Sequence, residues 1–404
     1  MRIIIPTIGT RGDVQPYIAL AAGLQKSGHQ VLVASHPGMQ KLVESYGIPF
    51  APMGPDVDLG MEAAIIRGRS RNWMMGFMRV MKFSFRMLEE SHTELLELCK
   101  GNDLVLISHS AAGSMEADQL GLPVVSATLM PQAIPVNDPA DNAFKKAGMK
   151  MAGGLMGMMM TRPLDRIRKR FGLPKMGPYG ISSPVLNLIP LSPTVIPPNP
   201  LWEARHKMTG YWFASSPAQW FPPRELVDYL AAGETPVVIS LGAMAISGDD
   251  ALDAARIAVN AVEKAGVRAI IQGWDEPMRQ LKYSERIFHG GSIPHDWLLT
   301  RASAFIHHGG FGSTSAGLKA GIPTMAVPHI IDQFIWGQKL FDLGVGPAPI
   351  PRSKLSVEGL CDALRGLTQN EDFHRNSGII GEAISREDGV EKAVRLIESV
   401  FHNG

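Results

Sequence analysis

A glycine-rich loop between a strand pattern and a helix pattern constrains the fold of this chain more than any other feature. The apolar run that starts at Ala304 ends at His307 and His308, and a helical pattern over residues 316–320 follows the loop. The loop itself contains three glycines: Gly309, Gly310 and Gly312. Glycine lets the main chain approach a ligand closely, and the free N–H groups at a helix N-terminus bind anions. The segment therefore predicts a binding site for a phosphate or a diphosphate.

The N-terminal residues repeat this arrangement of strand, glycine loop and helix. Residues 2–8 are largely apolar and β-branched, which is typical of a buried strand in a parallel sheet. A glycine loop and then a helical pattern over residues 14–26 follow, and further strand patterns lie at residues 30–35, 104–108 and 124–128. This alternation predicts a doubly wound α/β sheet that binds ligands at the carboxyl ends of its strands. Because the first loop lacks the GxGxxG pattern, a nicotinamide cofactor is not expected.

The second half of the chain starts the pattern again. Five prolines between residues 190 and 200 predict a stiff connection. Strand patterns follow at residues 236–241 and 268–272, with an amphipathic helix pattern at residues 249–265 between them. A chain of 404 residues is long for a single core. We therefore expect two similar α/β domains whose ligand loops face a shared cleft.

Charge, cysteine content and hydrophobicity exclude several classes of protein. The chain has 39 basic and 38 acidic residues, so no overall field attracts it to nucleic acid. Its two cysteines, Cys99 and Cys361, indicate neither a secreted disulfide framework nor a zinc cluster. The apolar run within residues 1–9 is too short for a signal peptide, and no stretch reaches the roughly 18 apolar residues of a membrane span. We expect a cytoplasmic protein, and contact with a membrane surface stays open.

Two segments combine methionine with basic residues. Residues 73–88 mix methionines and aromatic residues with arginine and lysine, and residues 145–170 carry eight basic residues and one acid. One interpretation is two core helices with solvated basic faces. The other is an adaptable acceptor pocket, because methionine fits varied apolar shapes, with a basic rim that meets anionic lipid. Three glycines favour a mobile loop in the second segment.

Two motifs resemble the signature of inverting nucleotide-sugar glycosyltransferases of the two-domain GT-B fold. One is HGGFGST at residues 308–314, followed by Gly321-Ile322-Pro323 and Asp332-Gln333, and the other is GTRGDVQP at residues 9–16. Both look most like those of sterol glucosyltransferases and bacterial natural-product glycosyltransferases. The resemblance covers nearly the whole chain and implies two Rossmann-like, doubly wound domains facing a central cleft. Their expected ranges are 1–200 for the acceptor, 201–380 for the donor, and 381–404 for a helix that crosses back to the first domain.

The resemblance also implies which residues bind the donor. Those for the diphosphate are Thr10, Arg11, Gly12, Ser240, Gly242, His308, Gly310, Gly312, Ser313 and Thr314. Those for the sugar hydroxyls are Asp332 and Gln333, and those for the nucleobase are Ile293 and Trp274. Trp274 is equally well explained by packing, and Arg11 by a pair with a surface acid. Ser292 stands where plant members of the wider family stack a tryptophan on the base, which leaves uridine and deoxythymidine both open.

Asp13 is the candidate catalytic base. Relatives with the GTRGDVQP motif use the aspartate of this loop, so the resemblance implies that Asp13 takes the proton of the acceptor hydroxyl. A positioned base contributes roughly 10²–10⁴-fold to a rate. Asp13 also suits a helix cap, and the two roles are compatible. No metal site is expected, because His307 and His308 are adjacent on a strand and point to opposite faces. His307 is interpreted as a core histidine.

The sequence thus predicts an inverting glycosyltransferase that needs neither a metal nor a cofactor. We expect it to move a hexose, most simply glucose, from a UDP-sugar or a dTDP-sugar to a hydroxyl of a hydrophobic acceptor such as a sterol, triterpenoid or polyketide. The alternatives are transfer to a membrane lipid, a nucleotide-sugar binder without turnover, and an epimerase of the same fold. UDP release that depends on an acceptor distinguishes a transferase from a nucleotide-sugar binder and from an epimerase. Flotation with liposomes identifies an enzyme that transfers the sugar to a membrane lipid.

Overall fold

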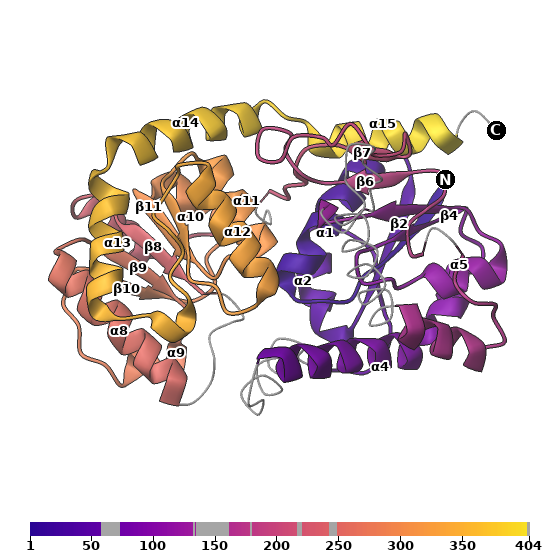
Figure 1. Cartoon of the computed structure of the whole chain (residues 1–404), viewed down its shortest axis with the longest axis horizontal. Coiled ribbons are helices and arrows are strands. Elements are labelled where there is room, and N and C mark those ends of the chain that lie inside the picture. The colour runs from indigo at the N-terminus through magenta and orange to yellow at the C-terminus, as the bar shows by residue number, and fades with distance from the viewer. Residues whose placement is uncertain are drawn as a thin grey trace, which may run out of the picture. The chain divides into compact units, whose positions relative to one another are not determined.

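The computed structural model describes residues 1–57, 73–131, 134, 161–177, 180–215, 220–241 and 249–401. The chain forms two compact units. Unit 1 comprises Met1–Asp58, Phe77–Phe213 and Asp388–Gly404, and unit 2 is centred on Ala214–Glu387. Figure 1 shows the elements of each unit along the chain. The proline-rich residues 190–200 belong to unit 1, so the chain enters unit 2 after Phe213 and not at residue 200.

Unit 1 is built on a seven-stranded parallel sheet in the order β3-β2-β1-β4-β5-β6-β7. Its strands are β1 (Arg2–Pro6), β2 (Gln30–Ser35), β3 (Phe50–Pro52), β4 (Leu104–Ile107), β5 (Val124–Ala127), β6 (Asn187–Ile189) and β7 (His206–Met208). The strand order reverses between β1 and β4. In doubly wound sheets, ligands bind beside the carboxyl ends of the strands at such a reversal.

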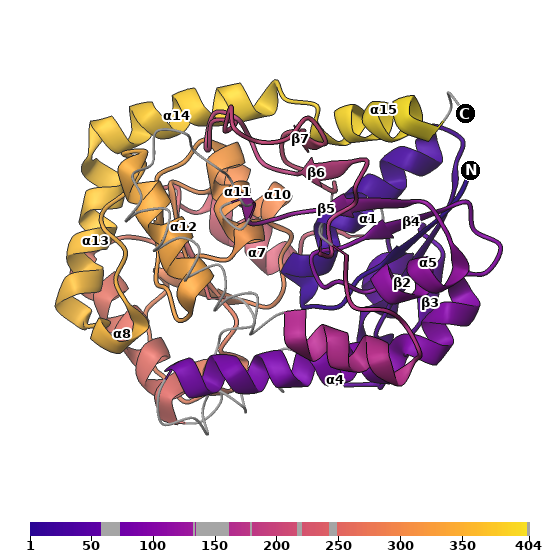
Figure 2. The same cartoon turned by 45° about the vertical axis from the view of Figure 1, so that its right-hand side comes forward.

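Helices cover the sheet of unit 1. They are α1 (Arg11–Lys26), the short η1 (Pro37–Met39) and α2 (Gln40–Glu44), α4 (Trp73–Cys99), α5 (Ser114–Leu120), a helix over residues 161–170, and α15 (Gly389–Phe401). The terminal helix α15 packs on α1, where Gly23 leaves space for Val390. His29, which precedes β2, also pairs with Glu398 of α15 at 3.1 Å. Figure 2 shows α15 and α4 in a second orientation.

Unit 2 is built on a five-stranded parallel sheet in the order β10-β9-β8-β11-β12. Its strands are β8 (Val237–Ser240), β9 (Ala269–Gln272), β10 (Ile287–Gly290), β11 (Ala304–His307) and β12 (Thr324–Ala326). The helices are α7 (Arg224–Ala231), α8 (Asp249–Ala265), α9 (Asp275–Arg279), α10 (His295–Leu298), η4 (Leu299–Arg301), α11 (Phe311–Ala320), α12 (Ile331–Asp342), η5 (Arg352–Lys354), α13 (Val357–Gln369) and α14 (Glu371–Ser385). Here the strand order reverses between β8 and β11.

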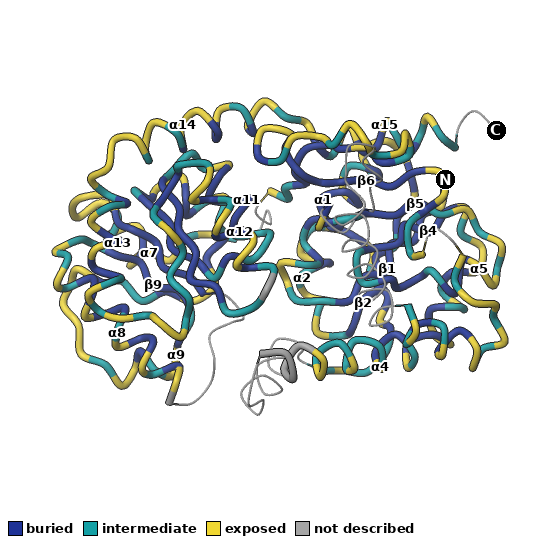
Figure 3. Tube along the Cα trace, in the orientation of Figure 1, coloured by how far each residue is buried: buried dark blue, intermediate teal, exposed yellow. Residues whose placement is uncertain are grey.

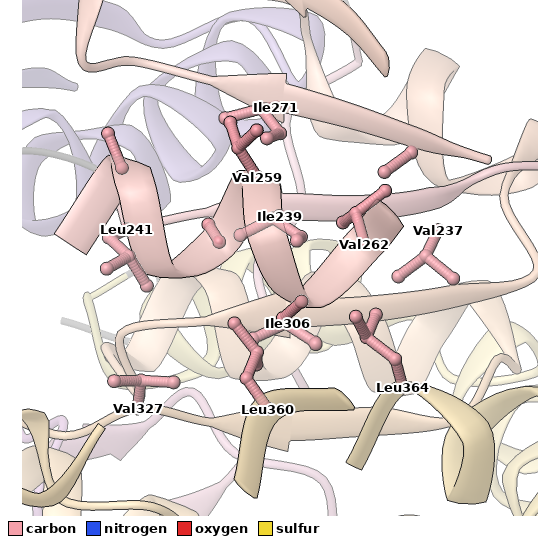
Figure 4. Packing of buried hydrophobic residues seen from close by; sticks show 14 of the residues in the cluster. Val237, Ile239, Leu241, Val259, Val262, Ile271, Ile306, Val327, Leu360 and Leu364 are labelled. Atoms are coloured by element: carbon pink, nitrogen blue, oxygen red, sulfur yellow. The ribbon is translucent and has the colours of Figure 1, made fainter. Parts of the chain in front are cut away.

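Helices on both faces explain why the strands of unit 2 are apolar along most of their length. Val237 and Ile239 of β8 pack with α8 and α13 on one face, as Figure 4 shows. Val238, between them, packs with Phe305 on the opposite face. Each fully buried side chain of this size stabilises the fold by about 1.5–3 kcal/mol. The strands of both units are accordingly buried in Figure 3, and the predicted doubly wound α/β class is confirmed.

No helix in the described part of the chain combines the length and the hydrophobicity that a membrane span requires. Cys99 and Cys361 are both buried free thiols. The expected cytoplasmic location stays a prediction.

Candidate active site

The predicted phosphate loop of unit 2 joins β11 to α11. Gly309 adopts a left-handed conformation with φ of +86°, which favours glycine, and Gly310 is the extended N-cap of α11. The first intrahelical bond runs from the Thr314 N–H to the Gly310 carbonyl at 2.9 Å. The N–H groups of the first turn, up to Ser313, therefore have no partner within the helix. A free helix N-terminus of this kind is suited to bind phosphate groups, and it lies at the residues that the sequence indicated. Phosphate binding at this loop stays a prediction.

His307 holds this loop from inside the unit. It is fully buried, and its Nδ1 accepts the main-chain N–H of Gly309 at 2.9 Å. The neutral imidazole therefore carries its hydrogen on Nε2. Burial, with His308 and His295 nearby, moves the pKa of His307 well below its ordinary value of 6.5. His307 is thus a structural histidine, as the sequence indicated.

His308 lies over the start of α11. A Cβ atom added to Gly310 would lie 2.3 Å from Nε2 of His308, so the imidazole occupies the space that this glycine leaves open. His308 is only partly buried, whereas His307 is fully buried. The two rings are almost perpendicular, at 89°. The absence of a side chain at Gly310 therefore leaves room for the imidazole of His308, as well as for a ligand that approaches the main chain.

Polar residues end three neighbouring strands at the same level of the sheet. Ser240 of β8 is in register with His307 of β11 on one side and with Gln272 of β9 on the other. Gln272 is buried, its amide nitrogen donates to the carbonyl of Ile293 at 3.1 Å, and its Oε1 has no partner among the described residues. Gln272 was not among the residues predicted from the sequence. A polar residue that ends an apolar strand at the carboxyl edge is the signal that indicates it.

Two hydroxyl residues lie in the first turns of α11. Thr314 is buried, and its Oγ1 has no hydrogen-bond partner within the described ranges. Ser313, one residue earlier, is partly exposed. A buried hydroxyl without a partner is costly, and a bound anion would supply the missing acceptor. Gly312 lies in the same turn, with its carbonyl bound by Ser315.

The predicted sugar-binding pair begins helix α12 beside this loop. A Cβ on Gly309 would lie 2.7 Å from the carbonyl oxygen of Gln333, so the two main chains are in close contact. Oε1 of Gln333 accepts the N–H groups of His329 and Ile330, at 2.8 and 3.3 Å, and thereby caps α12. Asp332 precedes it and is partly exposed. The structure thus brings the pair to the phosphate loop, and its contact with a sugar stays a prediction.

The two nucleobase candidates have buried side chains. Trp274 packs in the core between the sheet and α8, and it adopts a left-handed conformation with φ of +58°. Such a conformation is a rare outlier for a bulky residue and costs of order 1–3 kcal/mol. The side chain of Ile293 packs with Phe305 on the other face of the sheet. Both side chains are thus committed to cores of unit 2, and the role of these residues in binding a base stays a prediction.

In unit 1, Asp13 lies at the reversal of the sheet between β1 and β4. Its Oδ2 accepts both the main-chain N–H and the hydroxyl of Thr10, at 2.8 and 2.9 Å, in the first turn of α1. Its side chain is nevertheless 41% exposed. Gly9 makes room for it, because a Cβ there would lie 2.5 Å from Cβ of Asp13. Asp13 therefore both caps the helix and presents a carboxylate oxygen.

The other oxygen of Asp13 faces a network that sequence analysis missed. Nε2 of His109, which follows β4, lies 3.7 Å from Oδ1 of Asp13. The buried Tyr17 hydroxyl accepts the main-chain N–H of His109 at 3.0 Å and lies 3.2 Å from its Nδ1. Burial raises the pKa of Tyr17 and lowers the pKa of His109, although Asp13 opposes the second shift. Tyr17 therefore stays protonated.

The buried tyrosine fixes the tautomer of His109. Its oxygen already accepts one hydrogen bond, and its own hydrogen needs an acceptor inside the unit. Nδ1 of His109 is the acceptor that the described residues offer. The neutral imidazole then carries its hydrogen on Nε2, which points to Asp13. Asp13, His109 and Tyr17 thus form one chain of polar groups at the carboxyl edge.

The remaining predicted residues are distributed as follows. Arg11 and Gly12 are exposed in the first turn of α1, and Thr10 is its N-cap. Gly242 lies outside the described residues, as do residues 145–160 of the second methionine-rich segment. In the described part of the chain, no group of three or more histidine, cysteine, aspartate or glutamate side chains is arranged to hold a metal ion.

The buried His307 predicts a pH-dependent stability for unit 2. Its folded pKa is depressed, so below about pH 6.5 the unfolded chain binds a proton that the folded chain does not. The free energy of unfolding should therefore fall with decreasing pH, by up to about 1.4 kcal/mol per pH unit for this one residue. Urea unfolding at several pH values between 7 and 5 measures it. In His307→Asn, whose amide oxygen can still accept the Gly309 N–H, the curve should be flatter, and parallel curves would contradict the assignment.

Two family models match the chain. "Glycosyltransferase family 28 N-terminal domain" matches residues 3–126, and "Erythromycin biosynthesis protein CIII-like, C-terminal domain" matches residues 270–398. The first range contains Asp13 and His109, and the second contains the phosphate loop and Asp332-Gln333. Both groups of candidate residues thus lie within the ranges that the two family models match.

Curated relatives match along almost the whole chain. A sterol 3-beta-glucosyltransferase of Debaryomyces hansenii is 32% identical over 421 residues, which cover 97% of this chain and 26% of that protein. A sterol 3-beta-glucosyltransferase of Neurospora crassa is 33% identical over 429 residues, which cover 98% of this chain and 27% of that protein. The chain therefore spans about a quarter of the length of these relatives.

Solved structures share the fold. The glycosyltransferase SsfS6 of Streptomyces sp. SF2575 is 20% identical with a TM-score of 0.69, and 98% of this chain and 99% of that chain are covered. The glycosyltransferase VinC, solved in complex with dTDP, is 19% identical with a TM-score of 0.74 over 100% of both chains. These matches confirm the predicted GT-B fold. Over almost its whole length the chain is thus similar to sterol 3-beta-glucosyltransferases, and its fold is that of glycosyltransferases such as VinC and SsfS6.

Proposed function

We propose that this chain transfers a hexose from a nucleoside-diphosphate sugar to a hydroxyl group of a hydrophobic acceptor. The observation that carries the proposal is the loop between β11 and α11. Its left-handed Gly309, its N-cap Gly310 and the buried Oγ1 of Thr314 lie at a free helix N-terminus, which supports an anion site that needs no cationic side chain. The N-terminal family model and the curated relatives are named as glycosyltransferases, which supports a diphosphate as the anion.

We propose UDP-glucose as the donor and a sterol or a similar polycyclic alcohol as the acceptor. The curated relatives are named sterol 3-beta-glucosyltransferases, which supports glucose and a sterol. The solved structures of VinC and SsfS6 contain dTDP or thymidine diphosphate, so a dTDP-sugar is the donor to test beside it. Triterpenoids and polyketides are further hydrophobic alcohols to test as acceptors. The nucleotide sugar is a co-substrate, and no further cofactor is proposed.

The proposed reaction is a single in-line displacement at C1 of the sugar. The acceptor oxygen forms the new bond to C1 while the bond from C1 to the diphosphate oxygen breaks, and the acceptor proton passes to Oδ1 of Asp13. Thr10 holds the other carboxylate oxygen. The loop amides and His308 stabilise the charge on the departing diphosphate, and each well-aimed donor is worth about 3–4 kcal/mol in the transition state. The product is a β-glycoside, and we propose that no metal is required.

Acceptor-dependent release of UDP tests this proposal. The full chain is incubated with UDP-glucose or dTDP-glucose and with sterols, macrolides or flavonoids, in the presence and absence of EDTA. We expect release only with an acceptor, unchanged by EDTA, and a β-linked product by NMR. Binding of the donor without release of UDP would indicate a nucleotide-sugar binder. Conversion of the sugar without an acceptor would indicate an epimerase. An α-linked product would contradict the inverting mechanism.

The network behind Asp13 predicts that His109 positions this carboxylate. His109→Phe removes the Nε2–H and retains an aromatic ring beside Tyr17, and we expect it to lower kcat by roughly 10–100-fold with the KM for the donor unchanged. His109→Gln restores an amide N–H and should recover part of the loss. Tyr17→Phe removes the hydroxyl that fixes the tautomer, so it should lower kcat and alter the acid limb of the pH profile. Equal losses in kcat and donor affinity, or a wild-type pH profile for Tyr17→Phe, would return both residues to a structural role.

A further inference from the structure

A cavity of unit 1 is lined by residues of the two segments that combine methionine with basic residues, and none of the described candidate donor-binding or catalytic residues lines it. It opens between α4 and the helix over residues 161–170 and has a volume of about 410 Å³. Volumes of this size are typical of small-ligand sites. The two helices contact each other beside it, because Arg170 donates to Glu89 and Phe171 packs on His92. Figure 2 shows α4, which forms one wall.

Five basic residues line this cavity, and all of them are exposed. They are Arg79, Lys82, Arg86, Arg166 and Arg170. Glu89 is the acid among the lining residues, so the lining carries a net charge of +4, whereas the whole chain carries +1. Lys82 and Arg166 have no acidic partner among the described residues. The lining is thus strongly positive in a chain whose overall charge is close to neutral.

The remaining lining residues are apolar. Phe83, Phe85, Pro163 and Ile167 complete the walls. Ile167 is buried, and the other three are partly exposed. The guanidinium of Arg86 lies 5.3 Å from the ring of Phe83, so cationic and apolar groups alternate within one opening. Met78 of α4, the neighbour of Arg79 in the sequence, is an apolar residue with 57% of its surface exposed.

The cations of the 161–170 helix divide into two groups. Arg168 is buried, pairs with Asp118 at 2.8 Å and donates to the Pro174 carbonyl at 2.7 Å, which fixes the helix on the unit. Arg166 and Arg170 are exposed and line the cavity. Stability of the helix therefore explains Arg168 and, through the pair with Glu89, also Arg170, but it does not explain Arg166.

We propose that this cavity docks the chain on a membrane surface that contains anionic phospholipid. A lipid phosphate would bind among the cations, and the first methylene groups of the lipid would cover Phe83 and Ile167. A free phosphate would satisfy the cations alone and leave the apolar walls in water, so a lipid headgroup matches both parts of the lining. The proposal does not depend on sugar transfer, because docking is measured without any substrate.

Flotation with vesicles tests the proposal. The full chain is mixed with vesicles of phosphatidylcholine, or of an equimolar mixture of phosphatidylcholine and phosphatidylglycerol. We expect it to float with the mixed vesicles only and to dissociate at high salt. The double variant Lys82→Glu/Arg166→Glu should bind at least about tenfold more weakly. The double variant Lys41→Glu/Lys282→Glu makes the same change in net charge at two exposed lysines elsewhere and should bind like the wild type.

Three results would overturn the docking proposal. The first is wild-type protein that does not float with the anionic vesicles. The second is equal binding by the two double variants, which would indicate attraction by net charge alone. The third is binding of inorganic phosphate, lost in Lys82→Glu/Arg166→Glu, without any binding to vesicles, which would identify a site for a soluble anion. Equal thermal unfolding of the two variants shows that a loss of binding is not a loss of fold.

Discussion

Asp13→Asn is expected to lower the rate of sugar transfer by about 10²–10⁴-fold and to leave donor affinity unchanged. The amide cannot accept the proton of the acceptor hydroxyl. Its oxygen can still accept the two hydrogen bonds that Thr10 donates to Oδ2 at 2.8 and 2.9 Å, so the first turn of α1 should be retained. The rate is measured as UDP release, and donor affinity is measured by calorimetry.

Two controls separate the base from the helix cap. Thermal unfolding of Asp13→Asn should match the wild type, because the capping geometry is kept. Gly9→Ala keeps Asp13 but should also lower the rate of transfer. Its Cβ would lie 2.5 Å from Cβ of Asp13, so the carboxylate must move from its position. Asp13→Asn with near wild-type turnover would remove Asp13 from the reaction and leave it as a cap.

His308→Ala is expected to lower kcat/KM for the donor by roughly 10²–10³-fold, the usual cost of one donor at a developing negative charge. The imidazole lies over the N-terminus of α11, in the space that Gly310 leaves. Gly310→Ala places a Cβ 2.3 Å from Nε2 of His308 and should push the ring away. We therefore expect Gly310→Ala to reproduce much of the same loss. Initial rates at varied UDP-glucose measure both variants.

A double-mutant cycle shows whether the two residues act together. If Gly310 matters because it makes room for the imidazole, Gly310→Ala should add little to His308→Ala. Gly378→Ala is the matched control, because this glycine of α14 has no atom within 4 Å of an added Cβ, and its activity should stay at the wild-type level. Additive losses would mean that the alanine acts on the main chain of the loop, and a loss confined to folding would return His308 to the core.

The strand patterns of the sequence predicted the fold closely where the strands are long and covered on both sides. The apolar runs at β1, β2, β4, β8, β9 and β11 are buried between helices, so their composition carries the signal. The strands β3, β6, β7 and β12 have three residues each, and a run of that length has no readable period. Their positions follow from pairing with neighbours far away in the sequence.

The boundary between the units shows a similar limit. The prolines between residues 190 and 200 suggested a connection, but Leu191 and Val195 are buried within unit 1. Proline composition indicates that a segment is irregular, and irregular segments can still pack on a core. Only the tertiary contacts place the boundary after Phe213.

The candidate site residues likewise fall into a group that the sequence identified and a group that only the structure revealed. Asp13 lies in one contiguous motif, residues 9–16, and His308 and the glycines of the phosphate loop lie in or beside another, residues 308–314, so motifs could identify them. His109 is brought to Asp13 by the pairing of β4 with β1, and Tyr17 reaches it from the second turn of α1. Gln272 is brought to Ser240 by the pairing of β9 with β8. These residues belong to no motif, and their common signal is a polar group where a buried strand or its helix reaches the carboxyl edge.

Titration calorimetry of the full chain with UDP, dTDP and their glucose conjugates tests the central claim most directly. The account predicts saturable binding of at least one nucleoside diphosphate, weakened by Gly310→Ala and unchanged by Asp13→Asn. No detectable binding of any of these compounds by a folded wild-type chain would contradict it.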